Sequence, residues 1–225
     1  VYTMEVVCFL PGILGSELHT EAGVRVWPPT VSEAITQLED YKIAALLDET
    51  PLNPVGAVER VCVKNIYRGL IGAIEDMGFA RRGQQRQLSI LAYDWRLDIV
   101  DEIAPKVAET LSQLVNDGAT RLHLVAHSMG GLVGRVLLQD PRYKDEQWHG
   151  KVAQLITIAT PFKGAPLTMA RLLGMEGVSG IPATVFASLR GKARLRAPYQ
   201  LLPPPGTPMV WTIEGGAIRT HDLYN

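Results

Sequence analysis

Short apolar runs alternate along the chain with longer segments in which apolar residues recur every three or four positions. The apolar runs predict strands at 5–10, 88–95, 122–128 and 154–160, with a less distinct strand at 208–214. Strands that alternate with helices are typical of a mostly parallel sheet covered by helices on both faces. We therefore predict an α/β fold.

The helical periodicity is clearest in residues 99–118, between the second and third predicted strands. One face of this predicted helix carries Ile99, Ile103, Val107, Leu111 and Leu114. Asn116, Asp117 and Gly118 are typical of a helix end. Further helices are predicted at 66–78 and directly after Ser128.

Two segments interrupt the alternation and predict excursions from the sheet. Residues 20–54 and 162–205 are rich in proline, glycine and short helical patterns, and the second is interpreted as a cap or lid. A chain of 225 residues is long enough for one domain with such insertions. We expect residues 1–225 to form a single domain that lacks the C-terminal part of its fold.

Composition excludes several functional classes. The net charge of −1 provides no bulk attraction for nucleic acid, and no apolar run approaches the roughly 20 residues that span a bilayer. We expect a soluble protein of unknown compartment, without a signal peptide, transmembrane segment or nucleic-acid partner. Cys8 and Cys62 are predicted to be free thiols. Since no phosphate loop, dinucleotide motif or metal-ligand spacing occurs, neither a cofactor nor a metal is expected.

The stretch LVAHSMGGLVGR, residues 124–135, places a serine between a predicted buried strand and a glycine-rich helix start. A nucleophilic serine is presented on such a turn in α/β-hydrolases, and small residues two before and two after it relieve crowding. Here those residues are Ala126 and Gly130, where the usual motif has glycine at both. The Met129 amide then becomes an oxyanion donor at the helix N-terminus. The alternative is that Ser128 merely caps an ordinary helix.

A second oxyanion donor is expected from the loop after an earlier strand. Pro11 and Gly12 turn the chain directly after the first apolar run, and Ile13 is the residue whose amide would face Ser128. The alternative is an ordinary proline-glycine turn that leaves a strand.

Five motifs occur in the order and approximate spacing of one known family. They are PGILGSEL, AYDWRLD, AHSMGGLVGR, ITIATPFKGAP and YQLLP. Over about residues 6–203 the chain therefore resembles the lecithin:cholesterol acyltransferase-like family of α/β-hydrolases. The resemblance implies acyl transfer from a phospholipid or other ester, to water or an alcohol, through an acyl-serine intermediate at Ser128.

The resemblance also implies roles for residues outside the serine turn. Near the site, the matching residues are Tyr93, Asp94, Trp95 and Arg96 at a strand end, and Thr160, Pro161 and Phe162 in a turn beside the acyl pocket. His127 is placed in the pocket wall, because side chains of successive residues diverge. From the residues alone, Asp94 and Arg96 equally predict a mutual ion pair, and Trp95 a core position.

The chain departs from this family pattern at its C-terminal end. In α/β-hydrolases the acid and then the histidine of the triad follow the serine. After Ser128 the only histidines are His149, expected at the amino side of the sheet, and His221, whose neighbour Asp222 is followed by no histidine. The sequence therefore identifies no catalytic acid and no catalytic base.

Two interpretations of this gap remain open. In the first, the chain is a serine-dependent lipid or carboxylic ester hydrolase or acyltransferase, and a further C-terminal segment or another chain supplies the aspartate and histidine. In the second, the chain is a catalytically incomplete module that keeps the serine turn but binds a lipid or a partner without turnover.

Overall fold

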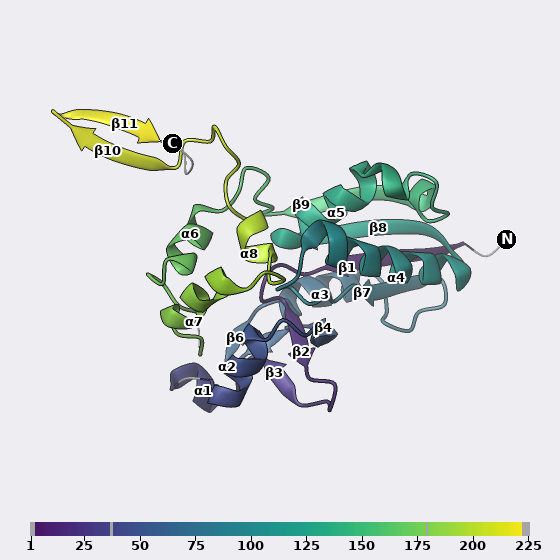
Figure 1. Cartoon of the computed structure of the whole chain (residues 1–225). Helices are drawn as coiled ribbons and strands as arrows, with labels where there is room; N and C mark the ends of the chain where they lie inside the picture. Colours follow the sequence, from purple (N-terminus) through teal and green to yellow (C-terminus); the bar gives the residue numbers. More distant parts are fainter. Residues whose placement is uncertain (1–2, 37, 179, 222–225) are drawn as a thin grey trace.

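The computed structural model describes residues 3–36, 38–178 and 180–221, and its centre is a sheet of four parallel strands (Figure 1). In spatial order the strands are β7 (Arg86–Ile90), β1 (Met4–Leu10), β8 (Ala119–His127) and β9 (Val152–Ile158). All three neighbouring pairs are parallel. The predicted mostly parallel sheet is confirmed.

Helices cover both faces of this sheet (Figure 1). They are α3 (Arg68–Asp76), α4 (Ala104–Asn116) and α5 (Met129–Gln139). In β1, Val6, Cys8 and Leu10 lie in the core cluster that includes α4 and α5, whereas Val7 and Phe9 lie in the cluster that includes α3. Burial on both faces explains why β1 is a continuous apolar run.

The predicted helix at 99–118 begins with a π-helical turn over Ile99–Ile103 and continues as α4 to Asn116. The Asp98 carboxylate accepts hydrogen bonds from two N–H groups of the first turn, at 2.8 and 2.9 Å. Gly118, at φ 107°, follows the helix end. All five residues of the predicted face are buried, which confirms the periodicity.

The segments predicted as excursions hold most of the elements outside the central sheet. Residues 16–57 contain β2 (Ser16–His19), β3 (Arg25–Trp27), α1 (Val31–Ile35), α2 (Asp40–Leu47) and β4 (Asn53–Ala57). A hairpin of β5 (Arg60–Val61) and β6 (Lys64–Asn65) follows, and the later segment contains α6 (Pro166–Leu172), α7 (Ala183–Ser188) and α8 (Ala197–Gln200). Because α7 contacts α2 as well as α6, the two segments pack against each other.

Two predicted strands differ from the structure. The run at 88–95 leaves the sheet after Ile90, because the Tyr93 N–H bonds the Ser16 hydroxyl instead of a neighbouring strand. The run at 208–214 does form β10 (Val210–Glu214), but it pairs with β11 (Ala217–His221) in a separate antiparallel hairpin away from the central sheet (Figure 1). Two glycines with positive φ form the turn between β10 and β11. This tight turn pairs β10 with the next strand along the chain, so β10 does not join the central sheet as predicted.

Both cysteines are free thiols, as predicted. Cys8 is fully buried, and burial raises the pKa of its thiol to about 12. Cys62 is only half-buried, at the turn of the β5–β6 hairpin. Across the ranges that the structure describes, no helix is both long and apolar enough to cross a membrane.

A buried ion pair joins the first inserted segment to the sheet. Both Asp94 oxygens accept hydrogen bonds from Arg96, at 2.8 and 2.6 Å, and one also accepts the Leu52 N–H at 2.9 Å. The remaining Arg96 donors reach four carbonyl oxygens at the end of α2 and in the loop after it, on Ala45, Leu46, Asp48 and Thr50. This network satisfies the last carbonyls of α2 and holds that loop against the strand end.

Replacing Arg96 by leucine leaves a buried carboxylate without its cation, so we expect the free energy of unfolding to fall by about 3–5 kcal/mol. Urea denaturation followed by circular dichroism measures this loss. Arg142→Leu is the matched control, because Arg142 pairs with Asp140 at the exposed surface, and the unfolding midpoint should move little. Equal losses in the two variants would contradict the structural role of the buried network.

Candidate active site

Ser128 lies at a sharp turn between the end of β8 and the start of α5. Its backbone has φ 51° and ψ −122°, a combination that a residue with a Cβ rarely adopts and that costs about 1–3 kcal/mol. The strain is held by hydrogen bonds on both sides, from the Ser128 N–H to the Ile158 carbonyl at 2.8 Å and from the Gly131 N–H to the Ser128 carbonyl at 3.0 Å. The side chain remains partly exposed.

The small residues around Ser128 are required by the packing of this turn. A Cβ on Gly130 would lie 2.4 Å from the Leu10 carbonyl oxygen and 2.6 Å from that of Pro11. Ala126 is fully buried within β8 without displacing the turn, so the departure from glycine at this position is tolerated.

The loop after β1 touches the serine turn directly. A Cβ on Gly12 would lie 2.9 Å from the Ser128 Cβ, and the Gly15 N–H donates to the Gly12 carbonyl at 2.9 Å across a tight turn in which Leu14 has φ 61°. Among the described residues, neither the Ile13 nor the Met129 N–H donates to a protein group. Two unused amide donors thus flank Ser128, one of them at the positive end of α5.

Tyr67, at the start of α3, links this loop to the serine turn. Its hydroxyl oxygen accepts the Gly12 N–H at 2.8 Å and lies 2.8 Å from Nδ1 of His127. The Tyr67 and His127 rings also pack edge to face. Burial lowers the pKa of His127 below its usual value, so the imidazole is neutral at pH 7.

A cavity of about 400 Å³ opens on the Tyr67 and His127 side of this turn. Its wall is mainly apolar and includes Ile13, Leu14, Trp27, Val58, Ile66 and Val178. The cavity is therefore formed jointly by the loop after β1, both inserted segments, the β5–β6 hairpin and the end of β8 at His127.

A model of the lecithin:cholesterol acyltransferase family matches residues 22–217 of this chain. The chain belongs to this family. No curated protein matches the sequence.

Among solved structures, a chain of the Tle4–Tli4 complex matches with a TM-score of 0.61 and 18% identity, over 92% of this chain and 56% of that chain. Lipase BlEst2 of Bacillus licheniformis in its mature form gives a TM-score of 0.40 and 14% identity, over 87% of this chain and 62% of that one. The present chain thus spans little more than half of the chain in the Tle4–Tli4 complex. Together with the parallel sheet and the family membership, the match to the Tle4–Tli4 complex identifies the predicted α/β-hydrolase fold.

In this member of the acyltransferase family, Thr160 and Phe162, both predicted near the site, lie in different surroundings. Thr160 contacts the position of Gly131 at the start of α5, and its buried hydroxyl has no hydrogen-bond partner. Phe162 is 46% exposed and lies on the outer side of α5, with the Arg135 guanidinium 5.8 Å from its ring. Of these two residues, only Thr160 adjoins the serine turn.

The structure places Asp94 and Trp95 below the loop after β1 and not in the cavity wall. Asp94 is occupied by Arg96, as the alternative interpretation of the sequence proposed. The Trp95 indole N–H donates to the Ser16 carbonyl at 3.2 Å. The Trp95 ring packs edge to face on Trp27, which lines the cavity. Trp95 therefore supports the cavity wall through Trp27. The hydrogen-bond partners of Asp94, which are Leu52 and Arg96, do not line the cavity.

The histidines that follow Ser128 lie elsewhere in the fold. His149 precedes β9 and lies 3.2 Å from the Leu138 carbonyl at the far end of α5, and His221 lies 2.9 Å from the Thr212 hydroxyl in the β10–β11 hairpin. Asp222 lies outside the described residues. Sequence reasoning missed the hydroxyls of Tyr67 and Tyr93, which both contact the loop after β1; only Tyr93 stood inside a recognisable motif.

Gly130→Ala is expected to lower the free energy of unfolding by about 1–3 kcal/mol, because the added methyl group collides with two backbone carbonyls that cannot move independently. Chemical denaturation measures the change. Gly72→Ala in α3 is the matched control, since an added Cβ there meets nothing within 4 Å and should raise stability by up to about 1 kcal/mol. A stable Gly130→Ala protein would argue against the close contact.

Stability should fall as the pH drops below about 6.5 because of two histidines. Burial lowers the pKa of both His123 and His127, so the unfolded chain binds protons that the folded protein does not. The stabilisation is fully present above the unfolded-state pKa and is lost as the pH falls toward the folded-state values. Urea denaturation at pH 7.5 and 5.5 measures it, and the double variant His123→Gln/His127→Gln should show a shallower pH dependence. An unchanged slope in that variant would contradict the assignment.

Proposed function

We propose that this chain carries the nucleophile and oxyanion donors of a serine-dependent acyl hydrolase or acyltransferase that acts on lipid or other carboxylic esters. The observation that carries the proposal is the strained Ser128 turn flanked by two unused amide donors, those of Ile13 and Met129. A helix-capping serine needs neither the strain nor the second loop, and Ser128 makes no side-chain capping bond to α5.

In the proposed reaction, Ser128 Oγ bonds to the carbonyl carbon of the ester while a base takes its proton. The carbonyl oxygen becomes an oxyanion, which accepts hydrogen bonds from the two amides. The C–O bond to the alcohol then breaks, and the alcohol leaves with a proton from the protonated base. Water or a second alcohol attacks the acyl-serine in the same way and restores Ser128.

The substrate class follows from the cavity beside the serine turn. Its apolar wall suits a hydrocarbon chain, and Ile13 belongs to both the cavity and the oxyanion loop. A larger hollow of about 750 Å³ lies between residues 48–51, 98–102 and 192–196, but its walls are charged and none of its lining residues belongs to the serine turn. There Arg194 pairs with Glu102 at 2.6 Å. We therefore assign the acyl chain to the smaller, apolar cavity.

The base and its orienting acid are proposed to come from a further C-terminal segment or from another chain. His149 and His221 make their hydrogen bonds far from the serine turn, and His127 directs Nδ1 to Tyr67. The same observation favours a second candidate function, a module that binds a lipid or a partner without turnover. Such a module would keep the cavity and the oxyanion donors, but its rate of ester cleavage would be several orders of magnitude below that of an enzyme with a complete triad.

Intact-mass analysis after exposure to an alkyl fluorophosphonate separates the two functions. With the base present, from the proposed C-terminal segment or second chain, we expect one reagent adduct per chain, lost in Ser128→Ala, because an activated serine forms a covalent bond to phosphorus and expels fluoride. The control is the same exposure of urea-unfolded protein, in which no adduct should form. Absence of the adduct on the folded chain alone is what a base supplied from outside this chain predicts. Absence of the adduct also in the presence of the proposed C-terminal segment or second chain would reject turnover and leave the binding module as the function.

A further inference from the structure

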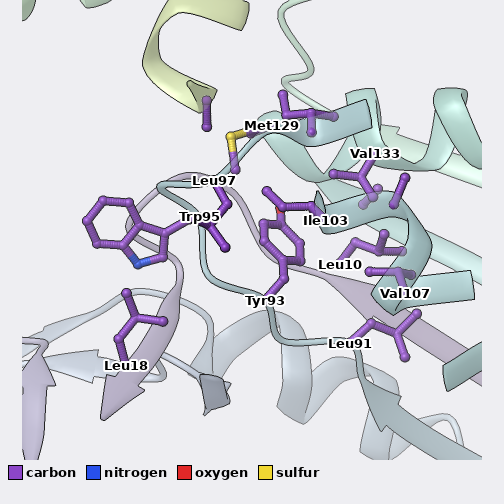
Figure 2. Packing of buried hydrophobic residues seen from close by; sticks show 14 of the residues in the cluster. Leu10, Leu18, Leu91, Tyr93, Trp95, Leu97, Ile103, Val107, Met129 and Val133 are labelled. Atoms are coloured by element: carbon purple, nitrogen blue, oxygen red, sulfur yellow. The ribbon is translucent and has the colours of Figure 1, made fainter. Parts of the chain in front are cut away.

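Two buried tyrosines hold opposite ends of the same peptide group next to the serine turn. The Pro11 carbonyl and the Gly12 N–H belong to one peptide plane. The Tyr93 hydroxyl donates to that carbonyl, and the Tyr67 hydroxyl oxygen accepts that N–H at 2.8 Å. Both side chains are at least 95% buried, and Figure 2 shows the Tyr93 ring among Leu10, Ile103 and Met129. The orientation of this peptide is therefore fixed from both edges.

The following peptide group is held at one end only. Its carbonyl, on Gly12, accepts the Gly15 N–H at 2.9 Å, whereas its N–H, on Ile13, has no protein acceptor among the described residues. Glycine has the fewest restrictions on its backbone dihedral angles. The orientation of the Gly12–Ile13 peptide therefore depends on the groups that bond the peptides on both sides of Gly12. Of the four polar groups in the two planes, only the Ile13 N–H is left for a ligand.

Tyr67 also ties the loop to the strand that presents Ser128. A phenol carries one proton, and because the Gly12 N–H donates to the Tyr67 oxygen, that proton is available to Nδ1 of His127. His127 then accepts at Nδ1 and carries its proton on Nε2, the tautomer assigned by this bond. One hydroxyl thus connects the oxyanion loop with the residue before the nucleophile.

We propose that Tyr67 and Tyr93 are positioning residues that set the direction of the Ile13 N–H toward the oxyanion formed at Ser128. Their hydroxyls contact none of the reacting atoms and act through the Pro11–Gly12 peptide, although the Tyr67 ring also lines the cavity assigned to the acyl chain. The inference rests on the proposed function, because an oriented amide matters only if an oxyanion forms there. Displacing such a donor by a fraction of an ångström weakens the transition state more than the ground state.

The test uses Tyr67→Phe and Tyr93→Phe, which remove one oxygen each and keep the ring. Tyr143→Phe is the matched control, because Tyr143 is also buried but its hydroxyl has no hydrogen-bond partner within the described chain. The rate of fluorophosphonate adduct formation is measured by intact mass over a range of reagent concentrations. We expect the limiting rate to fall at least about 10-fold in the two test variants, with the half-saturating concentration unchanged.

A merely structural role would give a different pattern. Loss of folded protein lowers the amplitude of labelling and leaves the limiting rate of the folded fraction unchanged, and such a result would overturn the proposal. So would a wild-type rate in Tyr67→Phe and Tyr93→Phe. The control Tyr143→Phe should label at the wild-type rate.

Failure of the proposed function is recognised separately. If the wild-type chain forms no adduct, the hold of Tyr67 on the Pro11–Gly12 peptide, here called the clamp, is tested by NMR. The measurement is the amide hydrogen exchange rate of Gly12, which requires no chemistry at Ser128. Exchange that is at least about 10-fold faster in Tyr67→Phe than in wild type and Tyr143→Phe would support the clamp, because the acceptor of that N–H is gone. Equal exchange in all three proteins would refute it.

Discussion

The site depends on the contact between the backbone at the end of β1 and the backbone of the serine turn. Gly12 approaches the Ser128 Cβ, and Gly130 approaches the carbonyl oxygens of Leu10 and Pro11, each at distances that leave no room for a methyl group. Carbonyls this close to a helix N-terminus face its positive end, which favours the arrangement. The close contact leaves the backbone of the serine turn little room to move, and hydrogen bonds of the Ser128 N–H and carbonyl hold its strained conformation.

The energetic support for this contact comes from several parts of the chain. Tyr93 and Tyr67 hold the loop after β1 from opposite sides, and the Asp94–Arg96 pair fixes the loop after α2 to the segment that follows β7. Each tie leaves a buried polar group unpaired if it is broken, so each is more costly to lose than its net contribution suggests. The backbone strain of about 1–3 kcal/mol at Ser128 is small beside the sum of these supports.

The parts of the fold with strong local signals could be predicted from the sequence. The face of α4 followed from the spacing of Ile99 to Leu114, and the serine turn followed from small residues between an apolar strand and a helix. Family membership was predicted from ordered motifs, and the family model confirms it. The roles of Ser128, Ile13 and Met129 in catalysis remain predictions.

What could not be predicted depends on contacts between distant residues. Tyr67 meets His127 across 60 positions, from a segment without a motif, and the separate β10–β11 hairpin depends on a local turn competing with the sheet. The apolar run of β9 has the composition of a buried strand, yet Ile156 and Ile158 are 44% and 37% exposed. Apolar alternation identifies a strand but does not say whether a helix covers it.

The proposed reaction requires two separate tasks, which fall to different parts of the molecule. In the proposed function, the oxyanion donors are oriented by the strand ends, the Gly12 turn and two tyrosines, all of which lie before or at α5. Activation of the hydroxyl requires a base, and the histidines at 149 and 221 are engaged elsewhere. Oxyanion donors and binding alone retain about 10³–10⁴-fold acceleration in serine hydrolases that have lost their triad. An oxyanion pocket that is pre-formed without the base therefore suits a protein in which the base arrives from a separately placed segment.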